Sequence, residues 1–226
     1  MKLGVLLPTF RNGAADAWDL AERAVDAGLD GLFAYDHLWP MGSPTRPSLA
    51  PFPLLASVAR RHDGVIVGPL VARVGLVGTD RLVEQFRTLE RVAPSRVICA
   101  LGSGDKLSAA ENGAYDVPVR SADERRALMA EAARELIEHM PIWFGAGNDE
   151  TNRVAREVGA TINLWDSTPP RIRAVAASGD VSWAGPVPGD LPATLDAVRD
   201  AGATWAIFAP DVDVRALRQW RDANND

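Results

Sequence analysis

The chain has 226 residues, of which 47% are hydrophobic, so it can bury a large core, and we expect one domain over residues 1–226. The 30 acidic and 24 basic residues give a formal net charge of −6, which argues against a nucleic-acid partner. The pairs Arg60-Arg61 and Arg125-Arg126 are expected on solvated helix faces. No apolar stretch approaches the length of a membrane span and no charged leader precedes the first strand, so we expect a cytoplasmic protein without a membrane partner.

Short apolar runs typical of strands alternate with longer amphipathic stretches typical of helices, eight times along the chain. The predicted strands are 3–7, 31–35, 65–72, 97–101, 142–145, 161–164, 181–184 and 204–209. The predicted helices are 15–27, 52–60, 79–92, 122–138, 149–158, 170–177, 191–201 and 214–222. This alternation predicts an α/β fold, a compact (β/α)8 TIM barrel, with an open doubly wound parallel sheet as the alternative.

Residues that directly follow the strands of a barrel converge at one end, where they can share a ligand. Asp36 and His37 follow the second strand, and Arg73 ends the third. An Asp-His pair at this place can simply fix a turn through the aspartate side chain. Its imidazole could instead donate a hydrogen bond or move a proton near neutral pH. Both interpretations stay open from the residues alone.

Two glycine-rich loops follow neighbouring strands. Gly102-Ser103-Gly104-Asp105 comes after the fourth strand, and Gly145-Ala146-Gly147 comes after the fifth. Such loops can present backbone N–H groups to a phosphate, although a tight turn between strand and helix needs glycine as well. Asp105 stands where a barrel enzyme places its acid or base, at the carboxyl end of a strand.

The histidines and tryptophans give weaker signals. His37, His62 and His139 have no His or Cys partner at ligand spacing, so we expect no metal site. Trp165 ends the sixth predicted strand and Trp183 lies inside the seventh, where either could line a hydrophobic substrate pocket. Filling of the core or of an interface is the alternative for both side chains.

The segment Lys2-Leu3-Gly4-Val5, the stretch 24–31 and Asp36-His37-Leu38 resemble the opening of the bacterial luciferase-like oxidoreductases, especially their deazaflavin-dependent branch. Three further segments resemble the third, fourth and fifth strands of that family: 67–71, 95–105 and 141–147. The segments follow one another in the family's order, which is more specific than any one of them. The resemblance implies a barrel that binds coenzyme F420, or FMN as the alternative, and transfers a hydride to or from a small organic substrate.

The resemblance also implies roles for particular residues. Asp36 and His37 would lie beside the redox ring, and His37 and Asp105 would be catalytic. Leu70-Val71 falls where the family often has a non-prolyl cis peptide against the ring. Backbone contacts to the ribityl-phosphate side of the cofactor are expected from Gly102, Gly104, Gly145, Ala146 and Gly147.

Departures from the family pattern suggest reduced insertions. Relatives carry a long excursion where this chain has one predicted helix between Asp116 and Pro141, so the cap over the mouth should be small. The proline-rich loop that starts at Trp39 is expected to form a lid or a subunit contact, with Trp39 near the ring and the substrate. The family implies a homodimer. An FMN-dependent reductase or monooxygenase, and a catalytically silent barrel that binds a flavin-like ligand, remain as alternatives.

Overall fold

The computed structural model describes residues 1–40, 43–44, 46–104 and 108–224. Within these ranges nine strands form one sheet, and each neighbouring pair of strands is parallel. The strands are β1 (Lys2–Leu6), β2 (Gly31–Ala34), β3 (Ile66–Pro69), β4 (Ala72–Arg73), β5 (Cys99–Gly102), β6 (Ile142–Gly145), β7 (Thr161–Trp165), β8 (Val181–Gly185) and β9 (Trp205–Phe208).

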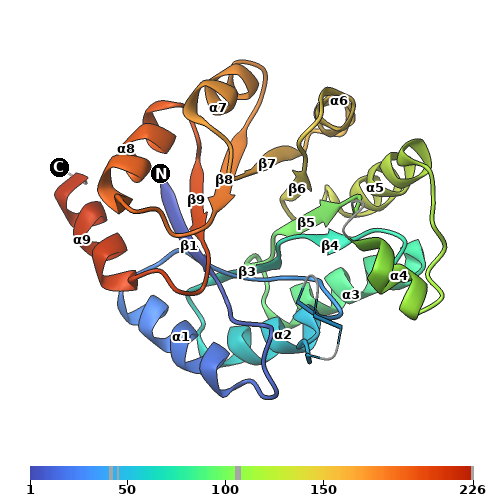
Figure 1. Ribbon diagram of the computed structural model, residues 1–226, viewed down its shortest axis with the longest axis horizontal. Helices are drawn as coiled ribbons and strands as arrows, with labels where there is room; N and C mark the ends of the chain where they lie inside the picture. The colour runs from blue at the N-terminus through green and yellow to red at the C-terminus, as the bar shows by residue number, and fades with distance from the viewer. Residues whose placement is uncertain (41–42, 45, 105–107, 225–226) are drawn as a thin grey trace.

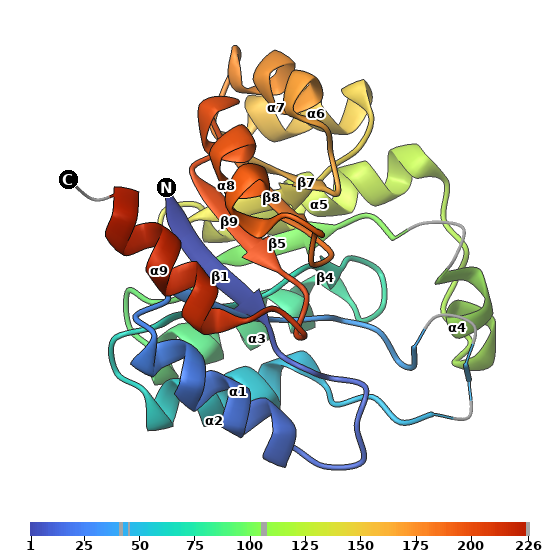
Figure 2. The same ribbon diagram turned by 60° about the vertical axis from the view of Figure 1, so that its left-hand side comes forward.

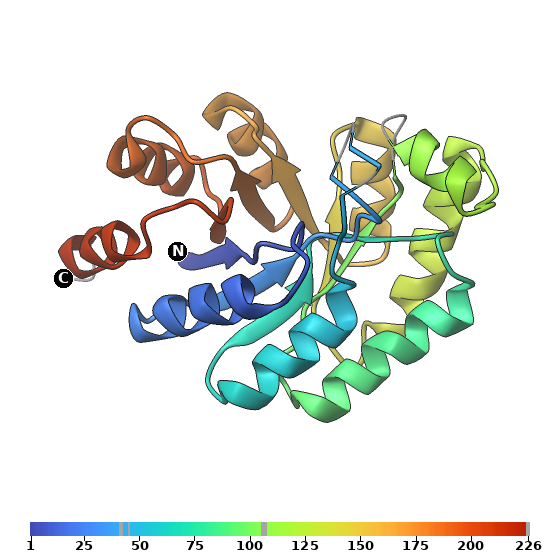
Figure 3. The ribbon, with the colours of Figure 1, turned by 60° about the horizontal axis from the view of Figure 1, so that its bottom comes forward.

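Helices surround the sheet on its outer side (Figure 1). They are α1 (Ala15–Asp26), α2 (Pro51–Arg61), α3 (Thr79–Val92), α4 (Ala109–Ala114), α5 (Ala122–Leu136), α6 (Asp149–Glu157), α7 (Pro169–Ala176), α8 (Leu191–Asp200) and α9 (Val214–Asn224). Helices α2, α7 and α8 have proline in their first turn, where the missing N–H is not needed. A capping box between Ser121 and Glu124 begins α5. Figure 3 shows α1, α2 and α3 along one side of the barrel.

The sheet closes on itself between β3 and β5. The strand order is β3-β2-β1-β9-β8-β7-β6-β5-β4, so β3 and β4 lie at the two ends of the order although they are consecutive in the chain. A single parallel bridge pairs Val67 with Val97 across this joint. There Val67 N donates to Arg96 O at 2.8 Å, and Ile98 N donates to Val67 O at 3.0 Å. The predicted TIM-like barrel is therefore confirmed.

The core has two layers because alternate side chains of a strand point to opposite faces of the sheet. Along β5, Cys99 and Leu101 belong to the layer between sheet and helices, whereas Ala100 faces the barrel interior. The interior is filled by large rings, with Trp143 and Trp205 5.5 Å apart between centroids. The interior cluster consists of Leu6, Phe33, Leu70, Ile98, Ala100, Trp143, Ala184, Trp205 and Ile207. The barrel is thus a packed core, and a ligand has to bind at one of its ends.

The structure differs from the predicted elements in two places. The third predicted strand is divided into β3 and β4 by a cis peptide bond between Leu70 and Val71. The short helix α4 was not predicted, because six residues give too little periodicity to recognise. Between Asp116 and Pro141 only α5 is present, as expected. Figure 2 shows α4 at the edge of the molecule, next to the proline-rich loop. Among the described residues, no helix is long and apolar enough to cross a membrane.

Candidate active site

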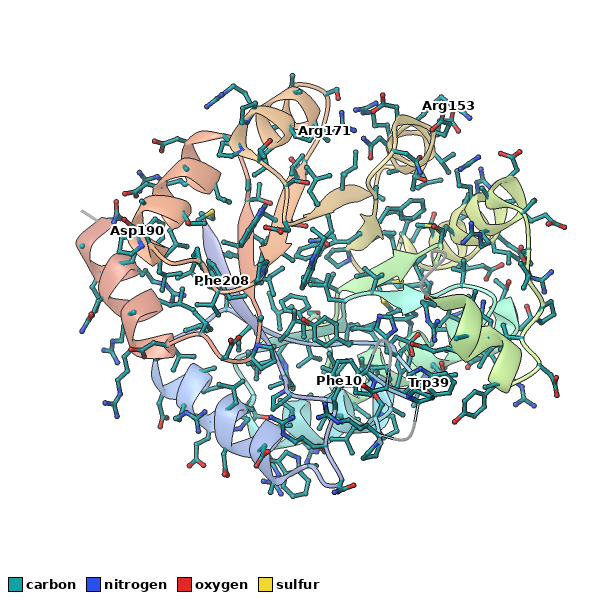
Figure 4. All side chains as sticks on the ribbon, in the orientation of Figure 1. Phe10, Trp39, Arg153, Arg171, Asp190 and Phe208 are labelled. Atoms are coloured by element: carbon teal, nitrogen blue, oxygen red, sulfur yellow. The ribbon has the colours of Figure 1, made fainter. Side chains whose placement is uncertain are left out.

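Aromatic side chains line part of the barrel mouth. Phe10, which follows β1, stacks on Tyr35 with ring centroids 5.7 Å apart and an interplanar angle of 7°. Tyr35 also meets the ring of Trp165 edge-on at 6.2 Å and the ring of His37 at 6.5 Å. Figure 4 labels Phe10, which follows β1, and Trp39, which follows β2. Trp165 is 49% exposed, so this aromatic wall is open to solvent.

A buried carboxylate connects the mouth residues. Glu111 of α4 is 1% exposed, and its Oε1 lies 2.9 Å from His37 Nδ1. Its Oε2 accepts hydrogen bonds from Arg73 Nη2 at 2.7 Å and from Leu38 N at 3.2 Å. The Arg73 side chain is 7% exposed, so this is a buried ion pair with a histidine on its other side. The contacts hold α4 against the ends of β2 and β4.

Asp36 joins this network through the backbone. Its Oδ2 accepts a hydrogen bond from Arg73 N at 2.8 Å. Burial raises the pKa of the Asp36 carboxyl, while the Arg73 N–H and the charges of Arg73 and His37 act in the opposite direction. The Asp36 side chain therefore binds the end of β4, 37 positions along the chain, which differs from the local turn considered from the sequence.

The partner of His37 decides which ring nitrogen is available for chemistry. A carboxylate accepts hydrogen bonds, so Glu111 favours the proton on Nδ1 of His37. The other nitrogen, Nε2, can then accept a proton or, when protonated, donate one. The His37 side chain is 24% exposed, so a ligand in the mouth can reach it.

Tyr35 supplies a second polar group on the same wall. Burial raises the pKa of its hydroxyl to about 12, and the charge of Asp211 adds to the shift. The phenol therefore stays protonated near neutral pH. A protonated phenol can donate a hydrogen bond.

Val71, which follows the cis peptide bond, packs against two of the glycines that were expected to contact the cofactor. A Cβ added to Gly102 would overlap Val71 Cγ2, and one added to Gly145 would lie 3.0 Å from Val71 Cγ1. The Val71 side chain thus explains why β5 and β6 both end in glycine. Leu70 is 5% exposed and belongs to the interior cluster, so these two residues form an apolar floor at the mouth.

The remaining glycine-loop residues differ in whether their backbone groups are already bound within the protein. Gly104 has φ +67°, and its carbonyl oxygen accepts a hydrogen bond from Arg125 Nη1 at 2.7 Å. The N–H of Ala146 donates to Asn163 O at 3.1 Å, so it is already used within the protein. A Cβ on Gly147 would meet nothing within 4 Å, so that backbone is open to a ligand. Asp105 lies outside the described residues.

The structure does not bring the three candidate tryptophans to one place. Trp165 lies at the mouth, whereas Trp39 is 7% exposed and packs on Tyr115 with ring centroids 5.8 Å apart. Trp183 belongs to the layer between sheet and helices, where its Nε1 donates to Ser167 O at 3.1 Å. It lines a separate cavity of about 400 Å³ between α8 and the loops that follow β7 and β8. Trp183 therefore contacts a cavity at the carboxyl ends of β7 and β8.

Sequence reasoning missed Glu111, the residue that joins the others. It lies in a stretch of small residues, Ala109-Ala110-Glu111-Asn112-Gly113-Ala114, and 74 positions separate it from His37. An isolated carboxylate in such a stretch is normally solvated, and only the docking of α4 buries it. The one sign in the sequence that Glu111 could be buried is its place among small residues, close after a glycine turn.

Comparison with known proteins identifies the family. A model of the luciferase-like monooxygenase family matches residues 1–138, more than half of the chain. The chain belongs to the luciferase-like monooxygenase family. This confirms the resemblance noted from the strand motifs, and it makes the protein a luciferase-like oxidoreductase.

Two of the curated proteins that this chain resembles are F420-dependent glucose-6-phosphate dehydrogenases. The relative from Intrasporangium calvum is 30% identical over 135 residues, which is 58% of this chain and 40% of that protein. The relative from Beutenbergia cavernae is 34% identical over 123 residues, which is 54% of this chain and 35% of that protein. The similarity thus spans well under half of each relative's length.

Solved structures share the fold over nearly the whole chain. An F420-dependent secondary alcohol dehydrogenase, in complex with an F420–acetone adduct, superposes with a TM-score of 0.80 at 12% identity and covers 100% of this chain and 99% of that chain. The coenzyme F420-dependent tetrahydromethanopterin reductase from Methanopyrus kandleri gives 0.75 at 12% identity, covering 97% and 96%. At such low identity these likenesses establish the barrel fold.

Proposed function

We propose that this luciferase-like protein is a coenzyme F420-dependent oxidoreductase that transfers a hydride between the deazaflavin and a small organic substrate. The observation that supports the proposal is the mouth network, in which buried Glu111 holds His37 Nδ1 at 2.9 Å while the His37 side chain stays 24% exposed. F420-dependent relatives among the curated proteins and the solved structures favour this branch over the FMN-dependent one.

The residues at the mouth fit a planar, largely apolar ring with a polar edge. Leu70 and Val71 would lie under the ring, and Tyr35 and Trp165 would flank it. The Tyr35 hydroxyl and His37 would meet its polar edge. Backbone at Gly147 is free to approach a phosphate, since no atom lies within 4 Å of its missing Cβ.

Bound F420 would supply the ring carbon that carries the hydride. The protein would position the substrate against the aromatic wall and exclude water from its apolar floor. His37 would hold or move a proton at Nε2, because Glu111 fixes the proton on Nδ1. Asp105, which follows the glycine turn, is proposed as the second proton-handling group, and Asp105→Asn should lower turnover while F420 binding stays near normal.

The test is a titration of the purified protein with F420 and, separately, with FMN, followed by the fluorescence of each ligand. We expect saturable F420 binding that is at least about tenfold tighter than FMN binding. His37→Ala should weaken F420 binding or slow hydride transfer by about tenfold or more. The matched control is His139→Ala, an exposed histidine three residues beyond the end of α5.

Each other outcome would change the proposal. Preference for FMN would make the protein a flavin-dependent reductase or monooxygenase with the same fold. Binding of neither ligand would favour the catalytically silent barrel. Equal behaviour of His37→Ala and His139→Ala would remove His37 from the site.

A further inference from the structure

A second cavity lies beside the mouth, and the segment 117–120, which joins α4 to α5, lines part of it. Its volume is about 190 Å³, roughly six times the ~30 Å³ of a water molecule. Residues 74–76 after β4 and residues 103–104 after β5 form one side, and α4 and the start of α5 form the other. Three arginines line it: Arg73, Arg120 and Arg125.

Arg73 is buried with donors that the protein does not use. The residue is 6% exposed, and one of its terminal nitrogens, Nη2, is bound to Glu111. Among the described residues, its Nε and Nη1 have no hydrogen-bond partner although both atoms are buried. An unpaired N–H of a buried guanidinium is costly, so a ligand that accepts from it would be stabilised.

Arg125 faces the same space from the opposite side. A Cβ built on Gly104 would lie 3.9 Å from Arg125 Nη1 and 3.9 Å from Arg73 Cδ, so the two side chains flank one glycine. Arg125 Nη1 donates to the carbonyl oxygens of Ser103 at 3.0 Å and Gly104 at 2.7 Å. Its Nε is buried without a partner in the described part of the chain. The sequence suggested that Arg125 lies on a solvated helix face, and the structure shows that it does not.

Among the described residues that line this cavity, the charged ones are all arginines. Within the described ranges, Arg125 and Arg120 form no ion pair, and Glu111 is the one carboxylate that pairs with Arg73. Arg120 approaches Gly75, whose missing Cβ would lie 3.4 Å from Arg120 Nε. Two further carboxylates lie near these arginines outside the lining, Asp36 near Arg73 and Glu124 near Arg120. Three arginines in the lining, two of them with buried unused donors, are typical of a site for an anionic ligand.

We propose that the cavity bounded by Arg73, Arg120 and Arg125 binds the phosphate or carboxylate group of a small molecule. The planar guanidinium groups suit an oxyanion with several acceptor atoms, and the volume admits such a group with a few further atoms. The group could belong to the substrate or to the cofactor's own phosphate. Phosphate binding itself does not depend on the proposed hydride chemistry.

The first test measures inorganic phosphate, and in parallel succinate, by isothermal titration calorimetry at constant ionic strength without cofactor. We expect saturable binding that Arg125→Gln weakens roughly ten- to hundredfold, as for loss of hydrogen bonds to a charged group. Arg126→Gln, which removes the same charge from the next residue of α5, should change the affinity less than about twofold. Arg126 does not line the cavity and pairs with Asp123.

Two further variants keep the test valid if Arg125→Gln fails to fold. Arg120 is exposed, so Arg120→Gln should leave the fold intact and still weaken phosphate binding. Arg73→Lys keeps a cation beside Glu111 but loses the planar guanidinium group, so it should also weaken phosphate binding. Absence of saturable binding, or equal losses in Arg125→Gln and Arg126→Gln, would overturn the proposal.

Repeating the phosphate titration at saturating F420 distinguishes the two sources of the anionic group. Unchanged phosphate affinity would assign the cavity to an anionic substrate. Mutual exclusion of phosphate and F420 would assign it to the cofactor's own phosphate. Failure of F420 to bind would count against the proposed function and leave the phosphate result standing.

Discussion

Glu111→Gln is the substitution that tests the mouth network most directly. The change removes the negative charge and keeps the shape of the side chain. In the wild type this carboxylate, 1% exposed, pairs with an Arg73 side chain that is 7% exposed. Removal of one partner from a buried ion pair leaves the other charge without compensation, at a cost of about 3–5 kcal/mol. The amide oxygen can still accept one hydrogen bond, which returns about 1 kcal/mol. We therefore expect the free energy of unfolding to fall by about 2–4 kcal/mol, a large part of the ~5–15 kcal/mol typical of a domain.

The assay is urea unfolding followed by circular dichroism, with the midpoint and the slope compared between variants. The control is Glu131→Gln on the exposed face of α5, which should change the free energy of unfolding by less than about 0.5 kcal/mol. Arg73→Met combined with Glu111→Gln should cost less than the sum of the two single changes, because neither charge is then left alone. A loss below about 1 kcal/mol for Glu111→Gln, or additive losses in the double variant, would refute the buried network.

Two further predictions concern the barrel joint and Asp36. Gly68→Ala should lower the free energy of unfolding by about 1–3 kcal/mol, because the new Cβ would lie 2.5 Å from the carbonyl oxygen of Ile98 across the joint. Gly64→Ala, with no atom within 4 Å of the new Cβ, should be nearly neutral in the same urea assay, and equal losses would contradict the joint's close packing. The folded-state pKa of Asp36 is raised above 3.8, so the native state holds this proton more tightly and stability falls as pH rises through that pKa. Asp36→Asn should therefore gain stability relative to wild type between about pH 4 and neutrality, and a difference that is constant or reversed with pH would show that burial does not dominate.

The architecture could be predicted from the sequence because strand and helix periodicities are local. Alternation of apolar runs and amphipathic stretches was enough for the barrel, and the end of each strand pointed to the mouth residues Asp36, His37 and Trp165. The hydrophobic pattern from Val65 to Ala72 gave no sign that the third strand is divided at Leu70-Val71, and only the family resemblance pointed to a cis peptide there.

The sequence indicated some residues of the candidate site but not the contacts between them, because these contacts join residues far apart in the chain. Contact between His37 and Glu111 depends on how α4 docks, and a short helix of small residues gives no sign of its direction. Arg125 was expected in solvent because its neighbours in α5 are charged, yet the helix begins beside the glycine turn and turns this side chain inward. For Trp183 the sequence left a substrate pocket and the core both open; alternation along β8 directs it to the layer between sheet and helices, where it also lines a cavity.

The exposure of Trp165 has a practical consequence. Its indole is 49% exposed, whereas the other six tryptophans of the chain are buried or half-buried. A collisional quencher such as iodide should therefore quench the fluorescence of Trp165 much more readily than that of the other tryptophans. Because Trp165 stands against Tyr35, any molecule that covers this wall would shield the indole from iodide. The protein thus carries an intrinsic optical probe of its mouth, which reports occupancy by colourless compounds as well as by coloured cofactors.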